Sequence, residues 1–210
     1  FLYTLTQEQL SHTLLPVGSL TKRQVREMAK KWNLPVATKQ ESQEICFVPS
    51  GRYPDFLRER IPQALLSGPI KDTTGRVLGE HKGIIHFTVG QRRGIGIAAL
   101  RPLYVVSIDA EKNLITVGSQ SDLLHKTLLA SSLNLIALET LAGPLSVKAK
   151  IRYKHDEARA LVTPVRLGQA LVEFDKPQRA ITPGQSVVFY ERDIVVGGGI
   201  IDEIPLRAGL

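Results

Sequence analysis

The sequence predicts an α+β, multi-domain chain with a helical part over residues 1–54, a small mixed α/β domain over 55–128 and a six-stranded β-barrel over 129–210. Three observations favour this division. An amphipathic helical pattern lies near the N-terminus, apolar and polar residues alternate from about residue 69, and about six short strand patterns separated by turn residues follow residue 128. A closed barrel is expected for those strands, because closure removes exposed edges that promote aggregation.

The clearest helix is expected to begin at Thr21. Residues Thr21 to Gln24 have the S/T-x-x-E/Q form of a capping box, in which the two side chains satisfy free backbone N–H groups at the start of a helix. The apolar residues that follow at helical spacing are Val25, Met28, Ala29 and Trp32. We expect this stripe to pack on a core. Pro35 disfavours helical geometry in the residue before it, which predicts an end near Asn33.

A second, shorter helix is expected over residues 54–61, and two hairpins follow it. The first joins Pro69–Lys71 to Arg76–Leu78 through a turn that contains Gly75. The second joins Leu103–Ile108 to Leu114–Val117 through a polar turn. Both hairpins belong to the mixed domain.

The barrel is expected to consist of six strands with turn residues between them. They cover Ser132–Leu138, Ser146–Tyr153, Ala158–Arg166, Gln169–Asp175, Ser186–Tyr190 and Ile194–Asp202. Gly197–Gly199 lies within the last of these strands. Three glycines inside an apolar strand indicate a bulge or close backbone packing, and we assign them no chemistry.

Composition favours a globular protein with a polyanionic partner. The chain has 210 residues, 43% of them hydrophobic, and 27 Lys and Arg against 20 Asp and Glu give a net charge of +7. An excess of positive charge favours binding to phosphates. The single cysteine excludes an internal disulfide framework, a Cys-rich zinc site and a self-contained iron–sulfur cluster. The five histidines lack metal-ligand spacing, so no metal site is expected.

The ends and the apolar stretches of the chain favour an intracellular protein. The chain begins Phe1-Leu2-Tyr3 without a Met and without the features of a secretory signal, and we interpret this start as a cut. The weakly charged stretch over residues 127–147 is interrupted by polar residues and by Gly143-Pro144. We therefore expect no membrane span and a cytoplasmic location.

The only thiol, Cys46, follows a polar run and lies between Ile45 and Phe47. A free cysteine is most often a small buried apolar residue. A functional cysteine needs a neighbouring positive charge or a helix N-terminus that lowers its pKa, and Lys39 is a candidate for that charge. The residues alone leave both interpretations open.

Two basic segments are candidates for phosphate binding. Gly90–Gly96 contains Gln91, Arg92 and Arg93 but fits neither the dinucleotide nor the Walker A pattern, so it is either a basic turn or a loop that contacts phosphates. In the second segment alternation places four basic residues on one face of a strand. They are Lys148, Lys150, Arg152 and Lys154. This face is either a solvated barrel surface or a phosphate track.

The segment Ser42–Phe47, preceded by Leu15–Gly18 and a basic helix, closely resembles the tRNA-specific 2-thiouridylases, which replace oxygen by sulfur at the wobble uridine of tRNA. Further blocks follow in the family's order and cover essentially the whole chain. They are Gly90–Gly94, Pro102–Val106, Lys150–Tyr153, Pro183–Tyr190 and Gly197–Gly199.

The resemblance implies a catalytic role for Cys46. In that family the matching cysteine carries a persulfide received from a sulfur donor, and its sulfur reaches carbon 2 of the uridine after ATP has adenylated the oxygen there. A polarisable thiolate suits both steps. The implied partners are tRNA and a persulfide-donating sulfur-carrier protein, and we expect the protein to be a monomer.

The resemblance also implies tRNA contacts at Arg152, Tyr153 and Gln185, and it favours the same role for Gln91, Arg92, Arg93, Lys148 and Lys150. Adjacent residues of a regular strand point to opposite faces. If Arg152 and Tyr153 both touch RNA, the strand must end or bulge there. Without the family, Gln185 would be interpreted as a turn residue after Pro183-Gly184.

Parts of the family pattern are not in this sequence. The Ser-Gly-Gly-x-Asp-Ser loop, a second cysteine and an acid/base Asp are missing, so residues 1–54 are expected to end an α/β catalytic domain whose ATP-binding part lies elsewhere. The chain alone is then expected to be inactive. Glu41 stands where the family commonly has Asp, and the loop from Gly96 to Pro102 is shorter than usual. The alternative is a non-catalytic RNA-binding barrel with a structural cysteine.

Overall fold

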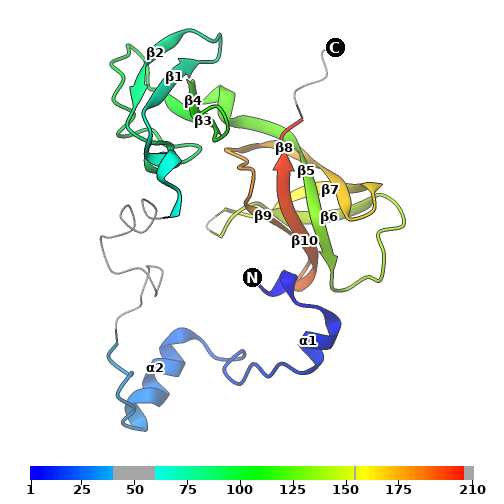
Figure 1. Cartoon of the computed structure of the whole chain (residues 1–210). Helices are drawn as coiled ribbons and strands as arrows, with labels where there is room; N and C mark the ends of the chain where they lie inside the picture. Colours follow the sequence, from blue (N-terminus) through cyan, green and yellow to red (C-terminus); the bar gives the residue numbers. More distant parts are fainter. Residues whose placement is uncertain (40–59, 154, 206–210) are drawn as a thin grey trace. The chain divides into compact units, whose positions relative to one another are not determined.

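The chain forms two compact units in a computed structural model that describes residues 1–39, 60–153 and 155–205. One unit consists of Phe1–Thr6 together with Ile61–Leu210, and the other is Gln7–Arg60 (Figure 1). Cys46 and most of the helix expected over residues 54–61 lie outside the described residues.

The unit Gln7–Arg60 contains the helices α1, Gln7–Ser11, and α2, Lys22–Lys31. The predicted capping box is present at Thr21. Its N–H donates to Oε1 of Gln24 at 2.8 Å, and the N–H of Gln24 donates back to Oγ1 of Thr21. After α2, Asn33 has a φ of 53°, which is typical of the residue that follows a helix. Both predicted ends of this helix are therefore confirmed.

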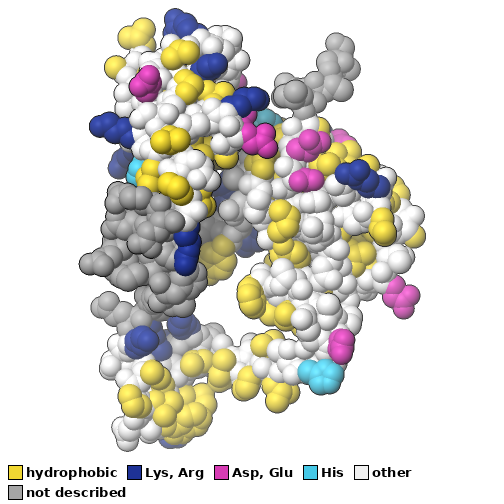
Figure 2. All heavy atoms as spheres, viewed as in Figure 1, with side chains coloured by type: hydrophobic (Ala, Val, Ile, Leu, Met, Phe, Trp, Pro, Cys, Tyr) yellow, Lys and Arg dark blue, Asp and Glu magenta, His cyan; other side chains and the backbone are white. Residues whose placement is uncertain are grey.

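The apolar stripe of α2 differs from the expectation. None of the residues of α2 is buried, and Trp32 is 62% exposed. Apolar side chains gather on this unit in Figure 2. The other large apolar residues of the unit that are exposed are Leu14, Leu15, Val17, Leu34 and Val36. Among the described residues, the stripe thus has no core on which to pack.

The mixed domain is built on a four-stranded sheet in the order β2-β1-β4-β3. Its strands are β1, Gly68–Asp72, β2, Val77–His81, β3, Tyr104–Asp109, and β4, Leu114–Gly118. The antiparallel pairs β1–β2 and β3–β4 are the two hairpins that the sequence predicts. A parallel pairing of β1 with β4 joins them, and fully buried side chains such as Ile70, Val105 and Ile115 form the core.

Short 3-10 helices lie at Leu2–Thr4, Pro62–Leu65, Ile84–His86 and Ser121–Leu123.

The second part of this unit is a closed barrel of six strands, as predicted, with antiparallel neighbours in the order β10-β5-β8-β7-β6-β9. The strands are β5, Leu124–Leu135, β6, Leu145–Lys150, β7, Ala158–Arg166, β8, Gln169–Arg179, β9, Ser186–Glu191, and β10, Ile194–Glu203. Four bounds differ from the sequence pattern by more than one residue. β5 begins at Leu124 and ends at Leu135 where Ser132–Leu138 was expected. β6 ends at Lys150 and not at Tyr153, and β8 continues past Asp175 to Arg179.

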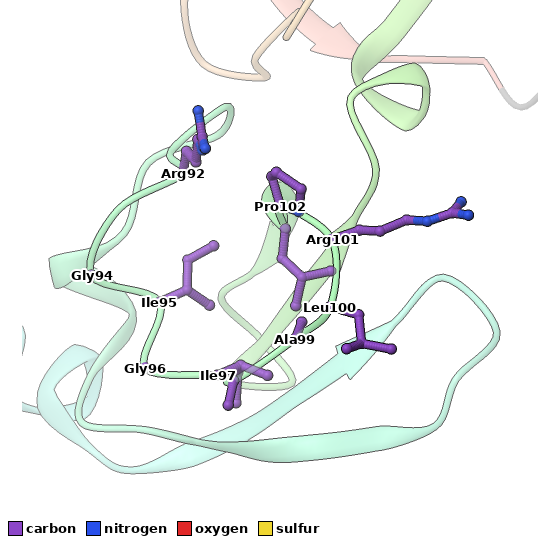
Figure 3. Close-up of a pocket in the computed structure, with 11 residues that line it drawn as sticks. Arg92, Gly94, Ile95, Gly96, Ile97, Ala99, Leu100, Arg101 and Pro102 are labelled. Atoms are coloured by element: carbon purple, nitrogen blue, oxygen red, sulfur yellow. The ribbon is translucent and has the colours of Figure 1, made fainter.

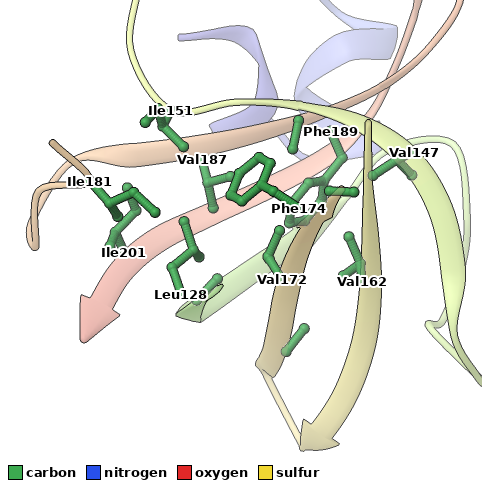
Figure 4. Close-up of a cluster of buried hydrophobic side chains, with 14 of the residues drawn as sticks. Leu128, Val147, Ile151, Val162, Val172, Phe174, Ile181, Val187, Phe189 and Ile201 are labelled. Carbon is green, nitrogen blue, oxygen red and sulfur yellow. The ribbon is translucent and has the colours of Figure 1, made fainter. Parts of the chain in front are cut away.

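Alternate residues of the strands fill the barrel. Figure 4 shows side chains from all its sides meeting inside, with Phe174 and Phe189 among the largest. Both phenylalanines are 1% to 2% exposed. A barrel of this size is narrow enough for side chains to fill it, so its interior is a core and not a channel.

Tyr3, near the start of the chain, packs against Gly198 of β10. A Cβ atom on Gly198 would lie 2.6 Å from Cδ2 of Tyr3, so the aromatic ring occupies the space that a side chain would need. Tyr3 is 4% exposed, and its hydroxyl lies 2.8 Å from Oγ of Ser186. Nδ2 of Asn134 donates to the carbonyl oxygens of Tyr3 and Leu5. The close backbone packing that the glycines predict is therefore confirmed, and at Gly198 it leaves room for the Tyr3 ring.

Tyr3→Ala is expected to destabilise the barrel unit by about 3–5 kcal/mol, because truncation of a buried aromatic side chain leaves a cavity. Tyr3→Phe keeps the ring and should cost only about 1 kcal/mol for the lost hydrogen bond. Urea unfolding measures both values. Equal unfolding midpoints for Tyr3→Ala and the wild type would show that this segment does not hold the barrel in solution.

Candidate nucleic-acid interface

The loop with the predicted residues Gln91, Arg92 and Arg93 is shaped by the side chain of Gln91. Its Oε1 accepts from the N–H of Thr88 at 3.0 Å, and its Nε2 donates to the carbonyl of Arg93 at 2.9 Å. The backbone of the loop also pairs with β3, because the N–H of Gly90 donates to the carbonyl of Val105. Gln91 thus supports the loop, while Arg92 and Arg93 are exposed.

The loop continues around a hollow of about 590 Å³ that is lined by Arg92 and residues 94–103. Figure 3 shows Arg92 on one side of this hollow and Arg101 on the other. Between them lie the glycines Gly94 and Gly96, and the apolar Ile95, which is buried. The arginines therefore stand at the edge of an apolar loop.

The chain leaves the strand geometry directly after Lys150, where β6 ends. The side chain of Ile151 is buried in the barrel core, whereas Tyr153 is 90% exposed. Arg152 is half-buried, and its Nη2 donates to the carbonyl oxygens of Arg179, at 3.2 Å, and of Ala180. Burial lowers the pKa of the Arg152 guanidinium, and the positive charge of Arg179 lowers this pKa further. Because the strand ends here, Arg152 and Tyr153 are not held to opposite faces of a strand.

The expected basic face over residues 148–154 is not one continuous strand face. Lys148 and Lys150 lie on β6, where Lys148 forms an ion pair with Glu157 and Lys150 is half-buried. Arg152 lies beyond the end of β6, and Lys154 is outside the described residues. Lys148 is therefore partly neutralised, and Arg152 is the described arginine or lysine of the turn after Lys150.

Arg179 connects the two basic segments, and the sequence analysis missed it. Nη2 of Arg179 donates to the carbonyl of Gly90 at 3.2 Å, and its guanidinium carbon lies 5.6 Å from the centre of the Tyr104 ring. Its own carbonyl accepts from Arg152. The run Lys176-Pro177-Gln178-Arg179 directly after a predicted strand was the available signal, but it does not show which loop Arg179 contacts.

Gln185 lies in the connection between β8 and β9 that begins after Arg179. Its side chain is exposed, and its backbone is fixed on both sides. The N–H of Gln185 donates to the carbonyl of Thr182, and the carbonyl of Gln185 accepts from the N–H of Ile201 at 2.8 Å. Gln185 is thus both a turn residue and an exposed polar group.

The described residues contain neither a metal-ligand cluster nor a helix suited to a membrane. Within residues 1–39, 60–153 and 155–205, no group of three or more His, Cys, Asp or Glu side chains is arranged to hold a metal ion. In the same ranges, no helix combines the length and the apolar character that crossing a membrane requires.

Three family models match consecutive parts of the chain. They are described as the tRNA methyl transferase HUP domain, which matches residues 1–50, the tRNA methyl transferase PRC-barrel domain, which matches 54–119, and the aminomethyltransferase beta-barrel domain, which matches 125–201. The third match falls on the six-stranded barrel, and the second ends close to the last strand of the sheet.

Several relatives are similar along nearly the whole chain. A tRNA-specific 2-thiouridylase MnmA from Acetivibrio thermocellus is 54% identical over 200 residues, and one from Moorella thermoacetica is 52% identical over 203 residues. A third, from Halothermothrix orenii, is 51% identical over 202 residues. These matches cover 95% to 97% of this chain but only 56% to 57% of the relatives. The chain therefore spans somewhat more than half of their length.

Gln91→Ala is expected to loosen the loop, because the N–H of Thr88 loses its acceptor. Hydrogen exchange at the Thr88 amide should become about fivefold faster, as follows from the loss of about 1 kcal/mol. Arg92→Ala is the matched control, since it leaves both Gln91 hydrogen bonds in place. Unchanged exchange in Gln91→Ala would contradict the supporting role of this side chain.

Proposed function

The chain belongs to the tRNA-specific 2-thiouridylase family, and we propose that it carries the tRNA-binding surface and the sulfur-bearing cysteine of an enzyme that 2-thiolates the wobble uridine of tRNA. Two of the family models are described in terms of a methyl transferase. Thiolation and not methylation is proposed because the relatives with 51% to 54% identity over 95% to 97% of this chain are named 2-thiouridylases.

The main support for tRNA binding is that two basic segments both contact Arg179. The exposed residues Arg92 and Arg93 come from one segment, and Arg152 and Tyr153 come from the other. Guanidinium groups bind phosphates with paired N–H donors, and an exposed tyrosine ring offers a surface on which a base can stack. Such a surface recognises the shape and the charge of a folded RNA more than its sequence.

The remaining tRNA contacts in the proposal surround this surface. Gln185 offers an exposed amide that can donate to a phosphate or accept from a ribose hydroxyl. Gln91 acts mainly through the loop that it supports. Lys150 extends the charge along β6, and Lys148 contributes less because Glu157 is its partner.

The chemical step is proposed for Cys46. Its thiolate takes a sulfane sulfur from the persulfide of a sulfur-carrier protein, whose own thiolate leaves. The terminal sulfur of the Cys46 persulfide then attacks carbon 2 of the uridine. The second cysteine of the family, which is not in this sequence, breaks the S–S bond and ends in a disulfide with Cys46, which a thiol reductant must reduce before the next turnover. ATP supplies the leaving group by adenylating the oxygen at carbon 2, and this use of ATP agrees with the match to the HUP domain. The Ser-Gly-Gly-x-Asp-Ser motif that would hold its phosphates is not in this sequence. We propose that the enzyme acts as a monomer in the cytoplasm.

We keep the three-domain division as part of the proposal, with residues 1–54 belonging to the catalytic part, 55–128 forming the mixed domain and 129–210 the tRNA-binding barrel. Two structural facts refine how these parts are joined. Residues 1–6 pack on the barrel, and β5 begins at Leu124.

Arg152→Ala should weaken tRNA binding and flatten its salt dependence by about one unit in a plot of log K against log salt, because one phosphate contact is lost. Binding of a uridine-34 tRNA transcript at several salt concentrations measures this slope. Arg166→Ala is the control, since Arg166 ends β7 at the side away from the 151–157 turn. Equal slopes for Arg152→Ala and the wild type would remove Arg152 from the interface.

Cys46→Ser should abolish thiolation in a protein that spans the full length of the family, since a hydroxyl cannot carry the persulfide. Binding of tRNA by the same variant should be unchanged. Mass spectrometry of the modified nucleoside measures the product. Undiminished 2-thiouridine would show that Cys46 is structural and would favour a purely RNA-binding role for this chain.

A further inference from the structure

We infer that Arg179 is a positioning residue that holds the loop Gly90–Arg93 and the turn Ile151–Tyr153 in one tRNA-binding surface. The inference rests on the proposed function, since the loop and the turn are the segments that are proposed to contact tRNA. It assigns Arg179 a role that differs from that of a phosphate ligand. Arg179 would act through the backbone positions that it fixes.

The contacts of Arg179 reach both segments at once. Its side chain donates to the carbonyl of Gly90, the residue directly before Gln91, and its guanidinium lies over the ring of Tyr104. Its carbonyl, together with that of Ala180, accepts from Arg152. One residue thus links a loop of the mixed domain to a turn of the barrel.

The backbone around Arg179 is closely fixed. The N–H of Ala180 donates to the carbonyl of Leu123 at 2.7 Å, at the start of β5. Gly90 has a φ of +89°, and a Cβ atom there would lie 3.1 Å from Cβ of Ala180. The two chain segments therefore approach so closely that a side chain on Gly90 would push them apart. The half-buried side chain of Arg179 adjoins this approach, since its Nη1 would lie 3.5 Å from the same Cβ atom on Gly90.

The electrostatics favour an anion at this joint. Arg152 and Arg179 are close enough for the charge of Arg179 to lower the pKa of Arg152. Within the described part of the chain, neither guanidinium has a carboxylate within ion-pair distance. Two neighbouring positive charges repel each other, and an RNA phosphate held by Arg152 offsets that repulsion while Arg179 stays on the Gly90 carbonyl.

Lysine cannot replace arginine in this arrangement. The planar guanidinium donates to the Gly90 carbonyl and covers an aromatic face at the same time, whereas an ammonium group is a strongly hydrated point charge. Arg179→Lys therefore keeps the charge and removes the link. This difference separates a positioning role from a phosphate contact.

The test measures tRNA binding for Arg179→Lys and Arg179→Gln, with Arg166→Lys as the matched control. We expect Arg179→Lys to bind about tenfold more weakly than the wild type although its charge is unchanged. We also expect Arg93→Ala to cost less affinity in the Arg179→Lys background than in the wild type, because the loop is already displaced. Wild-type affinity of Arg179→Lys, or strictly additive effects, would overturn the inference.

A second measurement needs no RNA. Hydrogen exchange at the amides of Gly90 and Val105 should be faster in Arg179→Lys than in the wild type, whereas the amides of the barrel core should not change. If both amides exchange at the wild-type rate, Arg179 does not hold the loop and the inference is wrong. If they exchange faster but the wild-type chain does not bind tRNA, the proposed function fails while the link between the segments stands.

Discussion

The structure of the larger unit depends on the absence of side chains from three consecutive residues of β10. This strand closes the barrel by pairing with β9 on one side and β5 on the other. A Cβ atom on Gly197 would lie 2.5 Å from the carbonyl oxygen of Asn134, and one on Gly199 would lie 2.7 Å from that of Ser131. β5 can pair closely with β10 only because Gly197 and Gly199 have no Cβ atoms. Closure then fixes the end of β8 and the turn after β6, and these carry Arg179 and Arg152.

The basic surface follows from that closure and not from a dedicated binding loop. The barrel supplies a rigid end with two carbonyl groups that orient Arg152, and the neighbouring sheet supplies the Gly90 loop. Rigid strands that present residues from their connecting turns are a common way to build a binding surface. In the proposed function, the apolar core of the barrel contributes to RNA binding only indirectly, since it keeps the turns at fixed positions.

Local sequence signals predicted much of the fold, whereas the contacts between segments far apart in the sequence could not be predicted. The capping box at Thr21, the two hairpins and the six barrel strands each depend on residues close in sequence. The parallel pairing of β1 with β4, the early start of β5 and the contact of Arg179 with Gly90 depend on residues far apart. The stripe of α2 was expected to be buried because its spacing is helical, but spacing does not supply a partner. At the site, the strand pattern ran to Tyr153, and only the condition that Arg152 and Tyr153 both touch RNA required an earlier end or a bulge; β6 ends at Lys150.

The connection between β4 and β5 restricts how homologous chains can differ in length. Only the residues 119–123 separate the last strand of the sheet from the first of the barrel, and Leu123 among them is buried and bonded to Ala180. An insertion there would shift the sheet against the barrel. The connection over residues 136–144 between β5 and β6 is largely exposed, and so is Leu167 in the turn between β7 and β8. Evolutionary insertions and deletions should therefore accumulate at those two places and avoid the joint.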